Sequence, residues 1–208
     1  MLMKKYQLSF TAVGLMPYEM QMVAQTYLEC GKDWNAAEKE IIERNILQKM
    51  TKATLKRKLQ EFKKRCTALN DEELMRLAEN KEIKAFAFLS AIKTYALLYE
   101  FCIEVLRNKY LNFDPVLLES DWNNFIESKK NISPDLAQKS ESTIHKAKQV
   151  IFNMLKGVGL IEGTTNRQIV RPYLSKDFVS CVCRDNPKWL AAFLYSESDI
   201  AIMCKERQ

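Results

Sequence analysis

Few residues in this sequence have the types and spacing from which a catalytic or metal centre is built. His145 is the only histidine among 208 residues, which excludes a multi-histidine metal site and a relay between two imidazoles. The glycines fit neither the GxxxxGK[ST] loop that cradles phosphates nor the GxGxxG loop that binds dinucleotides. We therefore expect a protein that is not an enzyme and that needs no metal and no cofactor.

The cysteines also lack the spacing of a chemical site. Cys181 and Cys183 have no companion pair for a zinc site and are not separated as a redox pair is. Each cysteine lies in an apolar pattern typical of a helix, which is how free thiols are distributed in a reducing cytoplasm. We expect a cytoplasmic protein without disulfide bonds, whose packed thiols are Cys30, Cys66, Cys102, Cys181, Cys183 and Cys204.

The strongest chemical signal is a run of basic residues from Lys49 to Arg65. This run contains eight lysines and arginines against one acid, Glu61, in a chain whose net charge is +6. A helix face that is only solvated usually alternates glutamate with lysine, because the two form ion pairs one turn apart. The near absence of acids favours an anionic partner, DNA or RNA. A solvated lysine-rich face is the alternative interpretation.

Two helices are needed to position this basic run. Apolar residues recur at helical spacing from Leu55 to Leu69, which predicts a helix over 51–69 with its lysines on another face. A helix over 36–47 precedes it after a short connection, so the pair predicts a helix-turn-helix. The first turn of the second helix would meet phosphates and base edges. The residues assigned to this DNA surface are Lys49, Thr51, Lys52, Thr54, Lys56, Arg57, Lys63 and Lys64.

A second group of basic residues lies between Ser142 and Pro172. The pattern predicts a helix over 141–158, then two short strands at 159–161 and 167–172 joined by a turn. This order resembles the recognition helix and wing of a winged-helix module, here the segment 141–172. A purely structural or protein-binding role is the alternative. The candidate DNA contacts are Lys146, Lys148, Arg167 and Arg171, and we expect them to contribute less than the basic run.

Helix signals recur along the whole chain, so the expected fold class is mainly α. Caps followed by apolar repeats predict helices at about 17–30, 36–47, 51–69, 71–79, 82–110, 115–128, 134–138, 141–158, 175–184, 187–196 and 198–205. Capping boxes are expected at Asn35 and Asn70. A join near 112–114 divides the chain into two packed helical lobes, 1–112 and 113–208. The apolar segment 85–106 is interrupted by charged residues, which favours a core helix over a membrane span.

Several segments resemble the BrxA family of bacteriophage exclusion (BREX) phage-defence systems. The chain opens with Ser9-Phe10-Thr11-Ala12-Val13-Gly14-Leu15 and then Glu19, which is similar to the opening of that family. Further similar segments follow in the family's order. They are Trp34 before a capped helix, Asn45 to Gln48, Thr51-x-x-Thr54-x-x-Arg57, Leu69 to Leu74, Glu104 to Lys109, Ile151 to Leu155 and Gly159 to Ile161.

The resemblance spans most of the chain and is firmest before Asn112. It implies a helical fold related to NusB-like transcription factors, with helix-turn-helix character and an ability to bind double-stranded DNA. It also implies an accessory role beside other BREX proteins, without a membrane and without catalytic residues to transfer. Two alternatives stay open, a protein adaptor that scaffolds other defence components and a NusB-like RNA-binding factor.

Overall fold

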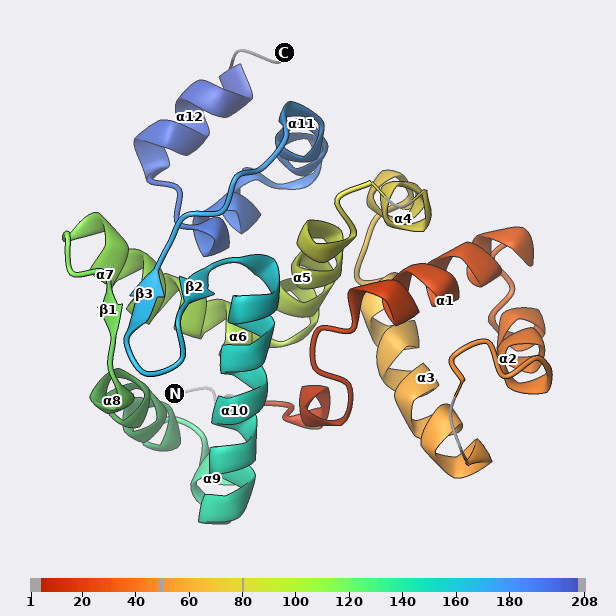
Figure 1. The fold of residues 1–208 in the computed structure, drawn as a ribbon, viewed down its shortest axis with the longest axis horizontal. Coiled ribbons are helices and arrows are strands. Elements are labelled where there is room, and N and C mark those ends of the chain that lie inside the picture. Colours follow the sequence, from red (N-terminus) through yellow and green to blue (C-terminus); the bar gives the residue numbers. More distant parts are fainter. Residues whose placement is uncertain (1–4, 49–50, 80, 206–208) are drawn as a thin grey trace. The chain divides into compact units, whose positions relative to one another are not determined.

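The computed structural model describes residues 5–48, 51–79 and 81–205, and its chain forms two compact units (Figure 1). One unit, called here the helical unit, comprises Ala12–Thr94. The other, the C-terminal unit, comprises Tyr95–Gln208 together with Met1–Thr11. The expected division at 112–114 therefore differs from the observed one. The cause is the apolar segment that begins at Tyr95, because its side chains belong to the core of the C-terminal unit.

The helical unit is built from five helices. They are α1 (Pro17–Glu29), α2 (Trp34–Glu43), α3 (Lys52–Thr67), α4 (Asp71–Ala78) and α5 (Ile83–Thr94). The short 3-10 helix η1 (Ser9–Ala12) precedes them in the chain, and all of it but Ala12 belongs to the C-terminal unit. Helix α5 has almost no polar face, since the residues from Ala85 to Ile92 are all buried. Helices α1, α3 and α4 pack against it, as the red to yellow ribbons in Figure 1 show.

Side-chain caps start three of these helices. The capping box at Asn70 is present as predicted, with the Glu73 carboxylate accepting from the Asn70 backbone N–H at 2.9 Å. The box expected at Asn35 is wrong, because Asp33 caps α2 instead by accepting from the Asn35 N–H at 2.8 Å. Glu73 is fully buried and also accepts two hydrogen bonds from the Lys93 ammonium, at 2.6 and 2.7 Å. This pair ties α4 to α5.

The C-terminal unit begins where the long helix expected over 82–110 is interrupted. Tyr95 has an extended backbone, and the chain continues as α6 (Ala96–Phe101), the π-helical segment η2 (Cys102–Arg107) and α7 (Asn108–Leu111). Phe101 packs edge to face on Trp122 and Phe125, at ring-centroid distances of 5.3 and 5.1 Å. These aromatic contacts join residues more than 20 positions apart, so the local periodicity of the sequence does not predict them.

No single described helix is long and apolar enough to cross a membrane. The segments Ile83–Thr94 and Ala96–Leu111 reach the required length and composition only as a bent pair, and most of their apolar residues are buried in the protein.

A small antiparallel sheet joins distant segments of the C-terminal unit. Strands β2 (Ile161–Glu162) and β3 (Arg167–Ile169) form the predicted ribbon, and β1 (Val116–Leu117) pairs with the other edge of β3. The strand order is β1-β3-β2. The helix expected over 115–128 is thus wrong at its start, because residues 116 and 117 pair with residues about fifty positions later. Helix α8 begins only at Glu119 and ends at Lys130.

The remaining elements of this unit are α9 (Pro134–Ala137), α10 (Glu141–Val158), α11 (Lys176–Asp185), the 3-10 helix η3 (Pro187–Phe193) and α12 (Glu197–Lys205). Helix α10 is the longest of them. Ser140 caps it by accepting from the Thr143 N–H, and Gly159 ends it with a left-handed conformation at φ 82°. Its inner face packs into the core through Ile144, Ala147, Ile151, Met154, Leu155 and Val158.

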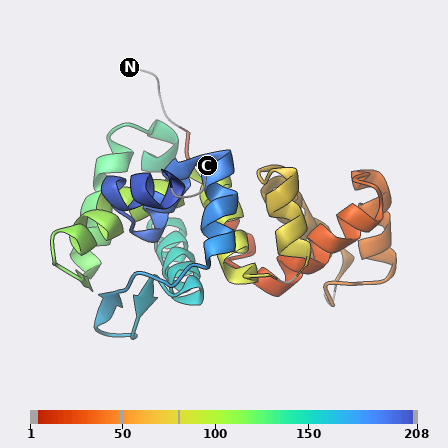
Figure 2. The same ribbon diagram turned by 90° about the horizontal axis from the view of Figure 1, so that it is seen from above.

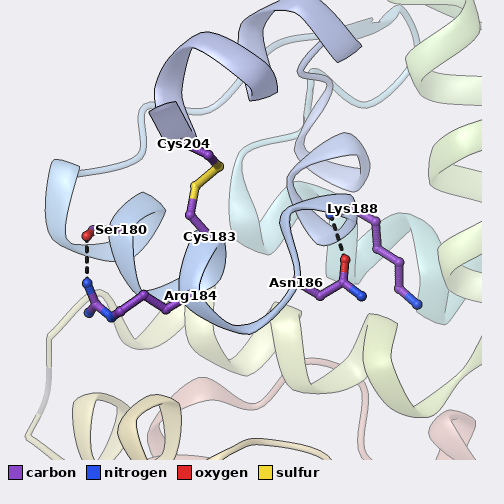
Figure 3. The surroundings of a disulfide bond; sticks show 6 residues. All are labelled: Ser180, Cys183, Arg184, Asn186, Lys188 and Cys204. Atoms are coloured by element: carbon purple, nitrogen blue, oxygen red, sulfur yellow. Dashed lines mark hydrogen bonds between the residues drawn. A yellow bond between two sulfur atoms is a disulfide. The ribbon is translucent and has the colours of Figure 1, made fainter. Parts of the chain in front are cut away.

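A disulfide bond joins Cys183 of α11 to Cys204 of α12 (Figure 3). The expectation of a chain without disulfides is therefore wrong. The two residues are 21 positions apart, and their Cα atoms lie 5.6 Å from each other because the two helices pack together. The other four cysteines form no disulfide bond, and Cys66, Cys102 and Cys181 are buried. Burial raises the pKa of the Cys66 thiol to about 12.

Candidate nucleic-acid interface

The first candidate surface is the exposed side of α3. Thr51 caps this helix, because its hydroxyl oxygen accepts from the Thr54 N–H at 3.2 Å. Both threonines, Lys56 and Arg57 are exposed to solvent. Lys49 lies outside the described residues, and so does the side chain of Lys52, although its backbone starts α3.

The basic run is not one continuous cationic ridge. Arg65 is fully buried, and its guanidinium donates to the Leu15 carbonyl at 3.3 Å. The Lys63 ammonium lies 5.4 Å from the centre of the Trp34 ring, a cation–π contact. Lys64 donates to the Glu61 carboxylate at 2.7 Å. Basic residues in the second half of α3 therefore take part in packing and ion pairing within the helical unit.

The second candidate surface is the outer face of α10. Six of the exposed residues of this helix share one side, because their spacings of three and four residues match the helical repeat. We call them the reader face: Ser142, His145, Lys146, Gln149, Asn153 and Lys156. None of the six is acidic, but Glu141, in the first turn of the same helix and one turn before His145, is also exposed. The buried residues of α10 lie on the opposite side, so the core fixes the direction in which this face points.

A hollow of about 520 Å³ lies between α10 and the β2–β3 hairpin. Figure 2 shows the hairpin beside α10, at the edge of the C-terminal unit. The hollow contains one carboxylate, Glu119, among several basic residues. Its polar and charged lining is Glu119, His145, Lys146, Lys148, Gln149, Asn153, Lys156, Thr164 and Arg167.

The turn between β2 and β3 requires glycine at position 163. Gly163 has φ +80°, and a Cβ atom there would lie 2.4 Å from the Asn166 carbonyl oxygen. An L side chain is strained at this φ and would collide with that oxygen. Gly163 and its neighbour Thr164 thereby form one rim of the hollow.

Glu119 organises two of the basic side chains. Its carboxylate accepts from the Lys148 ammonium and, at 3.0 Å, from the Arg167 guanidinium. The hydrogen bond from Lys148, and then the charges of Lys148 and Arg167, hold the pKa of the Glu119 carboxyl below its ordinary value. The Arg167 guanidinium also lies 4.8 Å from the centre of the Phe152 ring. Both cations are thus held in place at the mouth of the hollow.

A second hollow, of about 630 Å³, lies on the other side of α10. Helix α8 supplies Trp122, Asn123, Ile126, Glu127 and Lys130 to its lining, and α10 supplies residues from Glu141 to Gln149. The reader face is therefore a ridge with a hollow on each side.

Three of the four basic residues predicted in segment 141–172 come together around α10, and one does not. Lys146, Lys148 and Arg167 all line the first hollow. Arg171 lies elsewhere, because it pairs with Asp199 at 3.2 Å and stacks on Tyr110 and Tyr195. The structure therefore does not bring Arg171 to this hollow, and a DNA contact by Arg171 stays a prediction.

Several residues of this surface were missed as contacts from the sequence. Glu119 is remote in the chain, and only the β1–β3 pairing brings it beside Arg167. Gln149, Asn153 and Lys156 could have been predicted from the sequence, since they continue the polar repeat of α10. Among the described residues, no group of three or more His, Cys, Asp or Glu side chains could hold a metal ion.

Comparison with known proteins decides the family. The family model of BrxA matches residues 4–186. The chain belongs to the BrxA family. It is 29% identical over 177 residues to the BREX protein BrxA of Bacillus cereus strain H3081.97, which covers 84% of this chain and 88% of that protein. It is 25% identical over 162 residues to the BREX protein BrxA of Escherichia coli O9:H4 strain HS, covering 77% of this chain and 76% of that one.

A solved structure has the same fold. The crystal structure of an uncharacterized protein from Magnetospirillum magneticum superimposes with a TM-score of 0.80 and 21% sequence identity, covering 92% of this chain and 98% of that chain. At this identity the likeness concerns the fold alone, and it shows that the BrxA-family chain described here has a fold seen by experiment.

Proposed function

We propose that this BrxA-family chain is a non-enzymatic double-stranded DNA-binding protein that serves a BREX phage-defence system. Two of its relatives are named as BREX proteins, which supports the setting. The proposed DNA surface is the reader face of α10 with its two flanking hollows.

The observation that carries this proposal is the order of elements in the C-terminal unit, which resembles the order in a winged-helix module. Strand β1 precedes α8, then α10 follows, and the β2–β3 hairpin closes the sheet in the order β1-β3-β2. In such a module the last helix enters the major groove and the hairpin contacts the adjacent backbone. Here the equivalent helix is α10, and its outer face carries lysine, histidine and amide side chains, with Glu141 in the first turn as its one exposed acid.

The excess of positive charge lies in the hollow beside the hairpin, where Lys146, Lys148, Lys156 and Arg167 face one carboxylate, Glu119. The hollow beside α8 contains Glu127 and Glu141 as well, and its Lys130 pairs with Glu127. The two phosphate backbones of a major groove about 12 Å wide run on either side of an inserted helix. Each phosphate that a lysine or arginine neutralises releases counterions, which supplies binding free energy at low salt.

The exposed part of α3 is a second candidate surface and carries the cations of Lys56 and Arg57. Because Arg65 is buried and Lys64 is paired with Glu61, we now place α10 ahead of α3 as the main contact. This reverses the order expected from the sequence.

The test is duplex binding by fluorescence anisotropy at several salt concentrations. Lys146→Glu with Lys156→Glu should weaken binding to unrelated duplexes and reduce the slope of log affinity against log salt by about two. The matched control is Lys188→Glu with Lys205→Glu, two exposed lysines of the same unit whose reversal changes the net charge equally. Equal binding by both double variants would contradict the proposal.

The same assay separates the other functions open to this chain. A protein adaptor would show no shift with duplex DNA and would bind other BREX proteins in a salt-insensitive way. An RNA-binding factor would release duplex when structured RNA is added as competitor.

A further inference from the structure

The reader face places amide side chains between cations. Lys146 stands near one end and Lys156 at the other, and Gln149 and Asn153 lie between them. The two lysines are ten positions apart on the helix, a rise of about 15 Å. Cations at the ends of a face suit phosphates, whereas amides can donate and accept at once and so can distinguish base edges.

This composition differs from that of the exposed sides of α2 and α8. On α2 the surface charges pair with each other, Arg44 with Glu40 at 2.7 Å and Lys39 with Glu43 at 4.0 Å. On α8, Lys130 pairs with Glu127 at 2.6 Å. In the described part of the chain, no carboxylate forms an ion pair with Lys146 or Lys156. A face kept only for solubility would be expected to follow the pattern of α2 and α8.

The shape of the surface selects which groups can reach the bases. With a hollow on each side, α10 protrudes and can enter a groove, while the hollows make room for the two backbones. The side chains on the crest of the ridge then point to the groove floor. Gln149 and Asn153 are the central residues of that crest.

The two amides differ in what holds them. The Gln149 side chain hydrogen-bonds the His145 ring at 3.0 Å, one helical turn earlier, which orders it on the crest. Asn153 also lines the first hollow, and no other residue that the structure describes engages its amide. The opposite face of α10 at this turn is fixed by fully buried Met154 and Leu155. The backbone beneath Asn153 is therefore rigid while its amide is available.

We propose that Gln149 and Asn153 read base edges in the major groove and make this protein selective for sites that contain adenine. An amide of Asn or Gln can donate to adenine N7 and accept from adenine N6 at the same time, a pattern that no other base presents there. This inference rests on the proposed function, because it requires α10 to lie in the groove. It adds sequence selectivity to a binding surface otherwise defined by charge.

The experiment is selection of bound duplexes from a randomised library, followed by sequencing and by affinity measurement on the enriched sites. The full-length parent protein should enrich sites with A·T pairs at fixed positions. Asn153→Ala should lose the preference at one position, where the parent discriminates by about 5- to 150-fold. Its affinity for unselected duplex should stay within about twofold of the parent, because phosphate contacts carry no sequence information.

A specificity change is the sharper arm of the test. Asn153→Arg should shift the preferred base at that position from adenine to guanine, since arginine pairs with guanine O6 and N7. Asn124→Ala, an exposed amide on α8 away from both hollows, is the matched control and should leave the enriched sequence unchanged. Circular dichroism and thermal melting of each variant verify folding.

The outcomes separate this inference from the proposed function. Salt-sensitive duplex binding by the parent with no enriched sequence would overturn base reading and leave DNA binding in place. The same enriched sequence from the parent and from folded Asn153→Ala and Gln149→Ala variants would also overturn it. Absence of any duplex binding by the parent would remove the proposed function and this inference together.

Discussion

At the scale of single residues, Glu119 determines how available the cations of the first hollow are. It holds Lys148 and Arg167 in place, but its carboxylate also occupies the position that a phosphate oxygen would take between them. Because the pKa of this carboxyl is lowered, Glu119 keeps its negative charge through the pH range in which an ordinary glutamate is protonated. The charge is lost only in more acidic solution. The ion pairs therefore persist at neutral pH, where DNA would have to compete with them under the proposed function.

Replacing Glu119 tests this competition. Glu119→Gln should bind duplex DNA more tightly at low salt, with a salt slope steeper by up to about two, because Lys148 and Arg167 become free to neutralise phosphates. Anisotropy titrations measure both quantities. Glu127→Gln, which removes one charge from an exposed pair on α8, is the control and should change the affinity less. If the Glu119→Gln variant binds duplex DNA no more tightly than this control, the carboxylate only holds Lys148 and Arg167 in place and does not compete with phosphate.

At the scale of elements, α3 shows how one basic run can serve two purposes. Lys56 and Arg57 are exposed, and Arg65 two turns later is buried against the Leu15 carbonyl. Lys56→Glu with Arg57→Glu should change the free energy of unfolding by no more than about 0.5 kcal/mol per residue. Arg65→Glu should cost more than about 3 kcal/mol, since it places a carboxylate in a buried site shaped for a guanidinium. Urea unfolding measures both. Similar stabilities would mean that α3 does not pack as described.

A disulfide bond links α11 to α12. A thiol-reactive reagent should count four thiols in the protein unfolded without reductant and six after reduction, because two of the six cysteines are bonded. Cys183→Ser with Cys204→Ser should lower the free energy of unfolding by about 3 kcal/mol, the chain-entropy value for a closed loop of about 20 residues. Cys30→Ser, at a free and half-buried cysteine, is the control. Six thiols before reduction would show that the bond does not form.

At the scale of the whole molecule, the N-terminal segment belongs to the C-terminal unit although the helical unit follows it in sequence. Phe10 is fully buried and packs edge to face on Tyr95 at 5.4 Å. The Tyr6 hydroxyl donates to the buried Glu100 carboxylate at 2.7 Å, and Lys129 donates to the same carboxylate at 2.9 Å. Burial, and then the hydrogen bond to Glu100, raises the pKa of Tyr6. The first residues thereby complete the core of a unit formed mainly by residues after 95.

Hydrogen exchange can locate this dependence. Phe10→Ala should destabilise the protein by about 3–5 kcal/mol, the range for truncating a buried aromatic residue. The loss of protection should be largest in α6 and α8 of the C-terminal unit and smaller in α1, which follows Phe10 directly in the chain. Protection lost chiefly in α1 and α3 would contradict the assignment of residues 5–11 to the C-terminal unit.

The sequence by itself determined the helical class, most helix starts, the β2–β3 ribbon and the family. These features depend on local caps, on periodicity and on segments of contiguous residues, all of which are written along the chain. The capping box at Asn70, the apolar side of α3 and the inner face of α10 follow from such patterns. The basic run was also visible as a composition, because charge can be counted without a structure.

Only the tertiary structure decided which charges are exposed and what lies beside them. Arg65 and Arg171 are as basic as their neighbours, yet one is buried and the other is paired with Asp199. Glu119 comes to Arg167 through strand pairing, and Cys183 comes to Cys204 through the packing of two helices. Such contacts join residues far apart in the chain, so their free energy depends on the packed core. Local sequence therefore determined the helices, and tertiary packing determined the surface that they present.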